Sequence, residues 1–389
     1  MKQKIVYLSM LMLSSLQTYG YDYLPDDIPL NRVVLINAHN AAQSKEDGWI
    51  YYQQDGTLEK QWKAGARGGK FNFHWRKPMD TPTQIRETLE EKVSLFRKTS
   101  AFVYSLFGVK NKKNEPFIGL CHESDGKSNC ILSATVQKKG EIDNAADFLK
   151  KFAQLMKNNP KDVAVIIIEN YLHNRSEANG ALDYSDQEVD KKLDEVFEKS
   201  GLATYCYKLN DDPKHPWPTI GELRKSGKRL VVFNSKRATK YSNNYHSNFN
   251  GTYWKRHLTD DIKNGTCIIN SHKPDAQGFV VGNTFEQSIP EDSKKGAVLS
   301  FMEKLGININ IKGHIIGATN YNEINSKETI KKRVALCQDS NSEKTTLAQK
   351  GRLVATLLGI DMVEVGEAYQ AVKEINMQRI AEFNAEKAA

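Results

Sequence analysis

The sequence has little of what marks the most easily recognised protein classes. It has no hydrophobic run long enough to cross a bilayer comfortably, no internal repeat and no low-complexity tract. It also lacks HExxH, a P-loop, GxSxG and paired CxxC, so nothing supports a metalloprotease, a nucleotide hydrolase or an α/β-hydrolase. With 389 residues, 39% hydrophobic and 26% charged, the chain can fold as an ordinary globular protein with one large core or two modest ones.

Blocks of basic residues are also absent, although the net charge is +8. A positive charge that is spread over a long chain does not form the concentrated basic patch that nucleic-acid binding needs, so we expect no nucleic acid partner. Two interpretations remain open. The charge can give a mild attraction to anionic surfaces such as phospholipid headgroups, which allows peripheral membrane contact, or it can belong to a solvated surface without a preferred partner. We expect a monomer.

Cysteine is scarce, with five residues in the whole chain, and the odd number leaves one unpaired in any disulfide scheme. Cys121 and Cys130 lie close enough in sequence to clip one loop. The alternative is that several of the cysteines are buried free thiols.

The N-terminal residues 1–20 have the pattern of a secretory signal peptide. A basic start is followed by an apolar stretch and by small residues near Tyr19 and Gly20. We therefore expect a mature chain that begins near Tyr21 and is secreted or periplasmic.

Between residues 21 and 325, apolar runs of strand length alternate with amphipathic stretches of helical length. The runs are "VVLI", "KFNFHW", "FIGL", "VAVIII", "RLVVF", "TCIIN" and "HIIGAT". Strands that alternate with helices favour a parallel sheet, and the number of runs fits a distorted TIM-type (β/α)8 barrel. Residues 326–389 read as one or two helices, which we interpret as a C-terminal helical extension.

Several polar residues directly follow these apolar runs, and a barrel would gather them at one mouth. They are His39, His122, Glu169, Lys236 and Asn320. Two histidines at converging strand ends suit paired acid–base chemistry, because an imidazole titrates near neutral pH. Transfer at phosphorus needs such a pair, together with positive charge near the phosphate oxygens. The basic residues expected nearby are Arg67, Lys70 and Lys236.

The stretch "GARGGKFNFHW" predicts a strand with two different faces. A period of two places Phe71, Phe73 and Trp75 on the face that packs under helices. Lys70 and Asn72 then point into the barrel. An inward lysine is costly unless an opposite charge meets it, and Glu169 is the neighbouring candidate.

The chain resembles the phosphatidylinositol-specific phospholipase C-like phosphodiesterases of the X-domain type, in their single-domain plant and microbial form. The motifs that carry the resemblance lie between about residue 30 and about residue 325. They are "NAHNAAQ", "KQWKAGARGG", "LCHESDGKSNC", "FLKKFAQLMKNNPKDVAVIIIENYL", "HPWPTIGELRKSGKRLVVFNSK" and "HIIGATNYNE". The resemblance implies a distorted TIM barrel, cleavage of a phosphodiester and a place in lipid metabolism.

The resemblance also implies roles for individual residues. His39 matches the general base that activates the inositol 2-hydroxyl, and His122 matches the general acid that protonates the departing glycerol oxygen. Asn40 and Glu169 match positions that bind calcium in the calcium-dependent members. Lys236 matches a basic residue that contacts the substrate phosphate.

Three positions depart from the family pattern. Lys70 stands where calcium-dependent members carry an acidic ligand, and Asn72 stands where they carry aspartate. Asn320 falls about where many members have an aspartate that orients the first histidine. Because an ammonium group repels a divalent cation, we predict no metal cofactor, with calcium bound through Asn40 and Glu169 as the alternative. We expect Lys70, held by Glu169, to supply the positive charge instead.

Two further hypotheses follow from the same residues. The three departures can mark a catalytically inactive barrel that binds phosphoinositide or another anionic ligand. A glycerophosphodiesterase-type barrel would be a different enzyme class, which usually opens with "HRG" and has a Glu-x-Asp pair on the second strand. The matching stretches here are "HNA" and "KFN", so this class is disfavoured.

Overall fold

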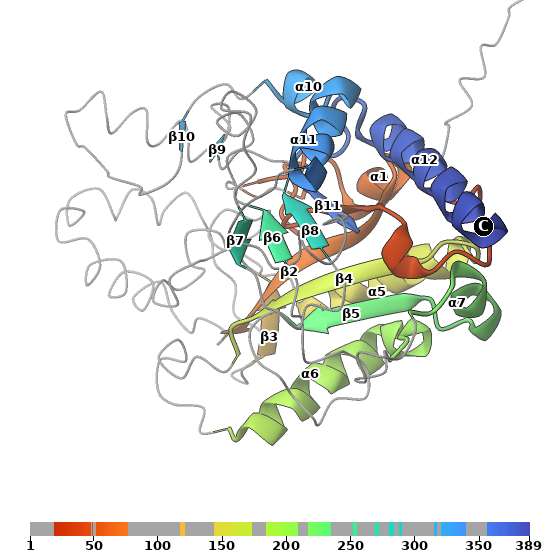
Figure 1. Cartoon of the computed structure of the whole chain (residues 1–389). Helices are drawn as coiled ribbons and strands as arrows, with labels where there is room; N and C mark the ends of the chain where they lie inside the picture. The colour runs from red at the N-terminus through yellow and green to blue at the C-terminus, as the bar shows by residue number, and fades with distance from the viewer. Residues whose placement is uncertain are drawn as a thin grey trace, which may run out of the picture.

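The computed structural model describes a mixed α/β domain (Figure 1). The described residues are 19–47, 49, 52–76, 117–120, 144–172, 184–208, 217–234, 252–254, 269–271, 280–283, 288–289, 315–316, 320–339 and 356–389. Some sequence predictions therefore fall outside the described residues. They concern most of the N-terminal leader, His122, Lys236 and the segment from Cys121 to Cys130.

The strands are short, apart from the second. They are β1 (Leu35–Ala38), β2 (Ala66–Arg76), β3 (Phe117–Leu120), β4 (Ala164–Asn170), β5 (Leu230–Asn234), β6 (Thr252–Trp254), β7 (Ile269–Ser271), β8 (Val280–Asn283), β9 (Ser288–Ile289), β10 (Ile315–Ile316) and β11 (Leu357–Ile360). The α-helices are α1 (Leu58–Lys63), α5 (Ala145–Asn158), α6 (Asp186–Ser200), α7 (Ile220–Ser226), α10 (Tyr321–Ile324), α11 (Lys327–Asp339) and α12 (Ala368–Ala388). Two 3-10 turns, Leu30–Arg32 and Leu202–Tyr205, complete the described elements.

Most of these strands form one sheet in the order β5-β4-β2-β1-β11-β8-β6-β7, and β3 pairs with the far part of β2. Its pairs are parallel, except for β2 with β3 and β6 with β7. The parallel α/β architecture predicted from the sequence is confirmed. Among the described residues, no pairing joins the two end strands, β5 and β7, to close the sheet into a ring.

Helix α5 covers one face of β2 and forms where its sequence predicts a helix. The Asn144 side chain caps the helix by accepting a hydrogen bond of 2.9 Å from the Ala146 amide. Phe148 and Phe152 pack edge-on against Phe71, with ring centroids 5.5 and 6.5 Å apart. The aromatic face of β2 therefore packs under a helix, as its period of two predicts.

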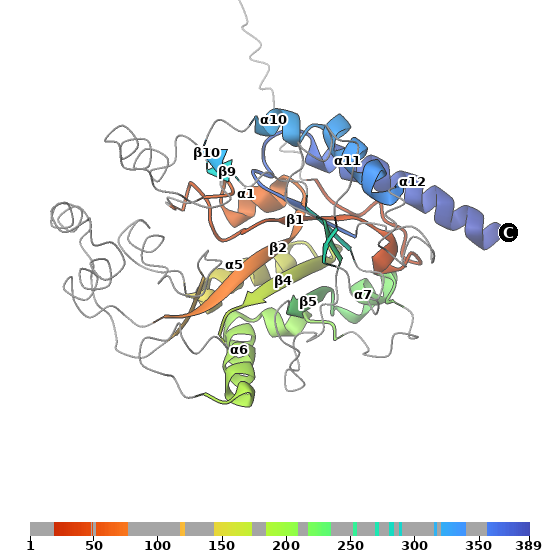
Figure 2. The same cartoon turned by 60° about the vertical axis from the view of Figure 1, so that its left-hand side comes forward.

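Helix α6 begins with a capping box and ends at a glycine. Ser185 and Glu188 form a reciprocal capping box at its start. Gly201 ends the helix with a φ of 76°, a left-handed conformation that glycine adopts without a steric cost. Helix α6 packs beside α5, on the side of the sheet where β4 and β5 lie (Figure 2).

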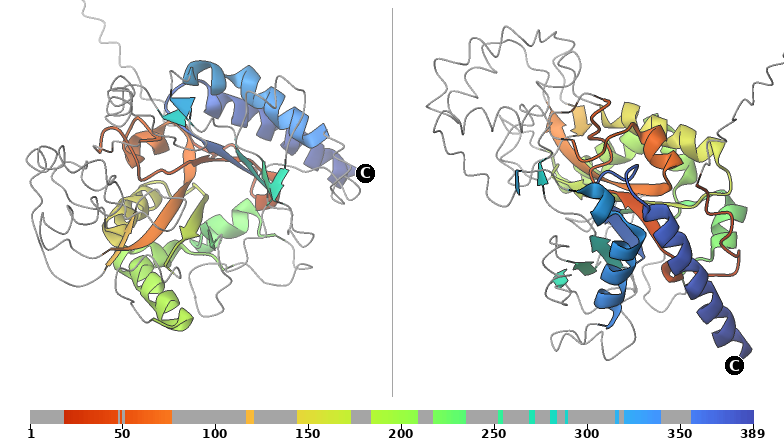
Figure 3. Two further views of the ribbon diagram at one scale, coloured as in Figure 1. Left: turned by 90° about the vertical axis from the view of Figure 1, so that its left-hand side faces the viewer. Right: turned by 90° about the horizontal axis from the view of Figure 1, so that it is seen from above.

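The C-terminal segment differs from the helical extension expected for residues 326–389. Helices α11 and α12 are present and pack side by side, but strand β11 lies between them in sequence (Figure 3). β11 pairs in parallel with β1 on one side and with β8 on the other, so the segment contributes a strand to the middle of the sheet. The apolar run "LLGI" is short, and periodicity alone cannot distinguish such a run from part of a buried helix.

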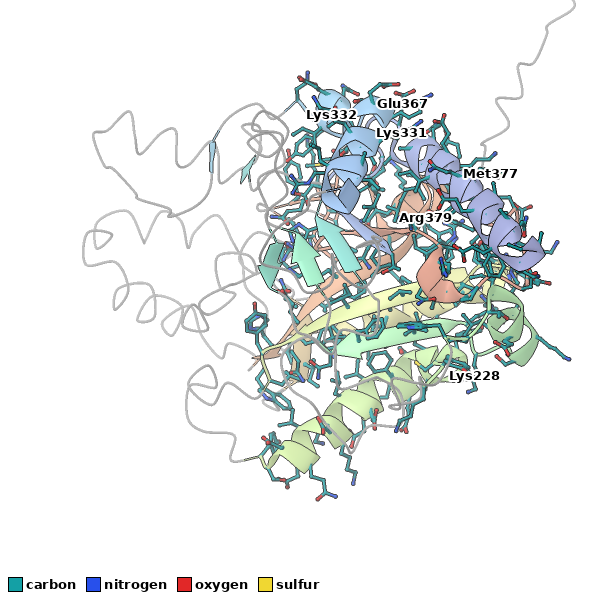
Figure 4. The ribbon with its side chains drawn as sticks, in the orientation of Figure 1. Lys228, Lys331, Lys332, Glu367, Met377 and Arg379 are labelled. Atoms are coloured by element: carbon teal, nitrogen blue, oxygen red, sulfur yellow. The ribbon has the colours of Figure 1, made fainter. Side chains whose placement is uncertain are left out.

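Helix α12 is tied to the chain just before β1. The Asn376 side chain accepts a hydrogen bond of 2.7 Å from the Val34 amide and donates one of 2.9 Å to the Val34 carbonyl. Arg379 is buried on the inner side of α12, whereas Met377 is 52% exposed and points outward (Figure 4). None of the helices in the described part of the chain has the length and hydrophobicity needed to cross a membrane.

Candidate active site

A group of polar side chains lies where the parallel strands β1, β11, β2 and β4 end or run past one another. In the strand register, Ala38 stands opposite both Ile360 and Gly69. The residues one position further on, which are His39, Asp361 and Lys70, therefore reach the same level. The same edge of the sheet receives Glu169 from β4, which lies opposite Asn72 of β2. This convergence follows from the parallel arrangement that the sequence predicts.

His39 and Asp361 form a buried pair at the centre of this group. Nδ1 of His39 donates to Oδ1 of Asp361 across 2.8 Å, and the two side chains are only 4% and 2% exposed. A carboxylate accepts hydrogen bonds and donates none, so Nδ1 carries the proton and Nε2 carries the lone pair. His39 is therefore held in the tautomer and orientation that a general base requires.

Asn320 was expected at the position that orients His39 in the family, and this prediction was wrong. Asn320 is exposed and caps α10, where its side chain accepts a hydrogen bond from the Glu323 amide. The partner is Asp361, which follows β11. Asp361 was not predicted from the sequence, because "LLGI" was assigned to a helix. The signal was nevertheless present, since "LLGID" is another apolar run that ends on a polar residue.

Side-chain amides hold the backbone around this pair. Nε2 of Gln54 donates to the carbonyl of His39 at 2.8 Å and to that of Ile360 at 2.9 Å, and so bridges the ends of β1 and β11. Nδ2 of Asn325 donates to the carbonyls of Asp361 and Met362 at 2.9 and 3.1 Å. These buried residues fix both members of the pair, and no motif in the sequence distinguished them.

Asn40 links His39 to the second strand of the site. Its backbone has a φ of 49°, a left-handed conformation that asparagine tolerates better than most residues. Nδ2 lies 3.2 Å from Nε2 of His39 and also donates to Oε1 of Gln53. Oδ1 accepts a hydrogen bond of 3.2 Å from Nδ2 of Asn72. Three side-chain amides thus form a continuous chain beside the imidazole.

Lys70 and Glu169 form the ion pair that the sequence predicted. Nζ of Lys70 lies 2.8 Å from Oε1 of Glu169, and the two side chains are 11% and 17% exposed. The hydroxyl of Tyr171 donates to the other carboxylate oxygen of Glu169 at 3.3 Å. The Tyr171 ring in turn stacks on His74, with centroids 4.4 Å apart. The ammonium group of Lys70 is therefore held in place on β2, two residues before Asn72.

Arg67 does not belong to this group, which corrects its expected role in phosphate binding. It stands near the beginning of β2, three residues before Lys70, and its side chain is 2% exposed. Nε lies 2.7 Å from Oδ2 of Asp162, and the guanidinium also donates to the carbonyls of Trp62, Ala66 and Tyr19. Burial lowers the pKa of Arg67, and the Asp162 carboxylate opposes that shift. Arg67 therefore has a structural role, as the buried cation that pairs with Asp162.

The loop that follows Asp361 carries a buried carboxyl group. Oε1 of Glu364 accepts a hydrogen bond of 3.1 Å from the Gly56 amide and so joins the segments 52–56 and 361–366. Burial raises the pKa of Glu364 to about 7. The loop that supplies Gln53 and Gln54 to the site is therefore attached through a group that titrates near neutral pH.

The residues at the calcium positions of the resemblance do not fit a divalent cation. Oε1 of Glu169 is occupied by the ammonium of Lys70, and Oδ1 of Asn40 accepts a hydrogen bond from Asn72. Calcium requires several oxygen ligands, and an ammonium at this place repels it. Among the residues that the structure describes, no cluster of three or more histidine, cysteine or acidic side chains could hold a metal ion.

Comparison with known proteins identifies the family. Residues 108–376 match the PI-PLC X 1 family, and the chain belongs to this family. The matched segment includes Glu169 and Asp361, whereas His39 and Lys70 precede it.

The comparison also finds similar individual proteins. A PI-PLC X domain-containing protein of Arabidopsis thaliana is 27% identical over 120 residues, which are 30% of this chain and 23% of the length of that relative. The phosphatidylinositol-specific phospholipase C of Listeria monocytogenes has a TM-score of 0.44 at 12% identity, over 93% of this chain and 98% of that chain. A mutant of the corresponding Staphylococcus aureus enzyme has a TM-score of 0.42 at 13% identity, over 92% and 97%.

Proposed function

We propose that the protein is a phosphoric diester hydrolase that acts on phosphatidylinositol or on a related inositol or glycerol phosphodiester. The observation that supports this most strongly is the proximity in the sheet of a buried pair and a partly buried pair. One pair, His39 with Asp361, can accept a proton, and the other, Lys70 with Glu169, carries a fixed cation. Membership of the PI-PLC X family agrees with this chemistry.

In the proposed reaction, Nε2 of His39 removes the proton from a hydroxyl next to the phosphate. The resulting alkoxide attacks phosphorus, and the bond from phosphorus to the departing alcohol oxygen breaks. The proton that this oxygen needs comes from a general acid, for which we propose His122. The first product is a cyclic phosphodiester. Asp361 stabilises the imidazolium that forms on His39 during the attack.

Lys70 is proposed to stabilise the charge that builds up on the phosphate oxygens. A fixed cation in a poorly hydrated site stabilises developing negative charge more strongly than the same charge in water. Lys236, which follows β5 in the sequence, is proposed to contact the same phosphate. Asn40 keeps the acceptor nitrogen of His39 in place until a substrate hydroxyl approaches.

The reaction is proposed to need no divalent cation, because Lys70 supplies the charge at the calcium position. The test is phosphodiesterase activity on phosphatidylinositol vesicles after dialysis against EDTA, with and without added calcium. Activity that is unchanged supports the proposal. Activity that disappears with EDTA and returns with calcium contradicts it.

The function itself is tested by His39→Ala and His122→Ala on phosphatidylinositol vesicles and on a soluble inositol phosphodiester. An active wild type and two variants with activity reduced at least 10³-fold support the enzyme. If the wild type hydrolyses neither substrate but binds inositol phosphate, the protein is instead the catalytically inactive barrel that binds an anionic ligand. Hydrolysis of the soluble ester alone would exclude a lipid surface as the site of action.

Export is proposed from the N-terminal signal pattern, whose residues lie almost entirely outside the described part of the chain. The expected mature chain begins near Tyr21. Intact-mass analysis of protein recovered from the medium or periplasm of the producing cell tests this, and recovery only of the full-length chain inside the cell contradicts it.

A further inference from the structure

The hydrogen bonds around His39 have a fixed direction, and Asp361 sets it. Because Asp361 accepts the proton on Nδ1, Nε2 of His39 is an acceptor and requires a donor. The donor is Nδ2 of Asn40, which also donates to Oε1 of Gln53. If the Asn40 amide were turned around, its oxygen would face two acceptors. The orientation of Asn40 is therefore determined by the His39–Asp361 pair.

The same reasoning extends from Asn40 to Asn72. Oδ1 of Asn40 faces β2, where it accepts a hydrogen bond of 3.2 Å from Nδ2 of Asn72. The oxygen of Asn72 must then point away from Asn40. Asn72 is 5% exposed, and among the described residues no group donates a hydrogen bond to its buried Oδ1. Nearly all buried acceptors in proteins receive a hydrogen bond, so we expect a bound ligand to donate one to this atom.

The surroundings of Asn72 restrict what that ligand can be. Asn72 stands two residues beyond Lys70 on the inward face of β2 and opposite Glu169 in the register. A cationic donor would approach the ammonium of Lys70 and be repelled. A hydroxyl group donates a hydrogen bond without bringing charge.

We propose that Asn72 is a specificity-determining residue whose Oδ1 accepts a hydrogen bond from a hydroxyl of the headgroup. This inference rests on the proposed phosphodiesterase function. The hydroxyl is a different one from that which His39 deprotonates, because Nε2 and Oδ1 of Asn72 are separated by the Asn40 amide. The preferred substrates are therefore phosphodiesters of an alcohol that carries at least one hydroxyl besides the attacking one, as a polyol ring does.

The experiment compares two soluble 4-nitrophenyl phosphodiesters with the full-length chain. One carries myo-inositol, and the other carries a 2-hydroxyethyl group, which has only the attacking hydroxyl. Asn72→Leu removes the acceptor with little change of volume, and Asn72→Ala serves if the leucine variant does not fold. The matched control is Asn170→Ala, a buried asparagine of β4 whose Oδ1 accepts a hydrogen bond of 2.9 Å from the Leu172 amide.

We expect the ratio of kcat/KM for the inositol ester to that for the hydroxyethyl ester to fall about tenfold in the Asn72 variants, as for loss of one hydrogen bond. The ratio should not change in the Asn170 control. An unchanged ratio in the Asn72 variants would overturn the inference and leave a water molecule as the donor.

If the wild type hydrolyses neither ester, the proposed function fails and binding decides the inference. Titration calorimetry with myo-inositol 1-phosphate should then give a Kd about tenfold higher for Asn72→Leu than for the wild type. Equal Kd values, or no binding to the wild type, would overturn the role of Asn72.

Discussion

Asp361 and His39 are 322 positions apart in the sequence and are joined by a hydrogen bond of 2.8 Å. The bond is possible because β11, near the C-terminus, pairs in parallel with β1, near the N-terminus. It supplies the acidic partner that the sequence analysis did not find at Asn320. One of the three departures that favoured an inactive barrel is thereby removed.

We predict that Asp361→Asn lowers kcat about 10⁴-fold on a soluble inositol phosphodiester. The carboxamide can donate to Nδ1 and so favours the tautomer in which Nε2 carries the proton. Asp147→Asn, an exposed change in the first turn of α5, is the control and should leave kcat within twofold of the wild type, about 0.4 kcal/mol. A loss below tenfold for Asp361→Asn would show that Asp361 does not orient the base.

Lys70→Met should lower kcat by a factor of about 10² to 10³, because the site loses its fixed cation. It should also destabilise the protein, since Glu169 keeps its negative charge in a mostly buried place. The double variant Lys70→Met with Glu169→Gln should regain stability without regaining kcat, which separates the two effects. Lys63→Met, on the exposed side of α1, is the control. Near-normal kcat in either Lys70 variant would contradict the proposed role.

Arg67→Met should leave the KM of the folded protein unchanged and lower the free energy of unfolding by about 3–5 kcal/mol. The reason is that Asp162 would remain buried without its cation. Arg32→Met removes an ion pair with Glu386 whose arginine side chain is 50% exposed, and it should cost about 0–1 kcal/mol. Denaturant unfolding and substrate titration measure the two quantities. A raised KM with normal stability would return Arg67 to the phosphate site.

Stability should decrease between pH 4.5 and about pH 7 because of Glu364, whose pKa rises from 4.5 to about 7 in the folded chain. In that interval the unfolded chain loses a proton that the folded chain retains. The full effect is about 3 kcal/mol, complete above pH 7. Glu364→Gln should remove this part of the pH dependence and raise Tm at pH 8 relative to the wild type. Parallel Tm profiles for the two proteins would rule out the effect.

The sequence was sufficient for those parts of the site that depend on one strand or on neighbouring strands. A period of two in β2 placed Lys70 inward and Phe71 under α5, and the adjacency of β2 and β4 joined Lys70 to Glu169. These relations need only local pattern and the parallel connection rule.

The parts that could not be predicted depend on long-range register. "LLGI" is too short to be recognised as a strand, so Asp361 was overlooked. Arg67 was placed in the site because the starting point of β2 was unknown; it is the second residue of this eleven-residue strand and stands three positions before Lys70. The amides of Gln53, Gln54 and Asn325 act through hydrogen bonds that no spacing in the sequence reveals.

The position of β11 in the middle of the sheet has a consequence for biosynthesis. A ribosome must synthesise the chain at least as far as β11 and Asp361 before β1 gains its neighbour on that side and His39 gains its carboxylate. A product truncated upstream of β11 would expose an unpaired strand edge and would lack an oriented base. Such a product would lack both the central strand of the sheet and the carboxylate that contacts His39.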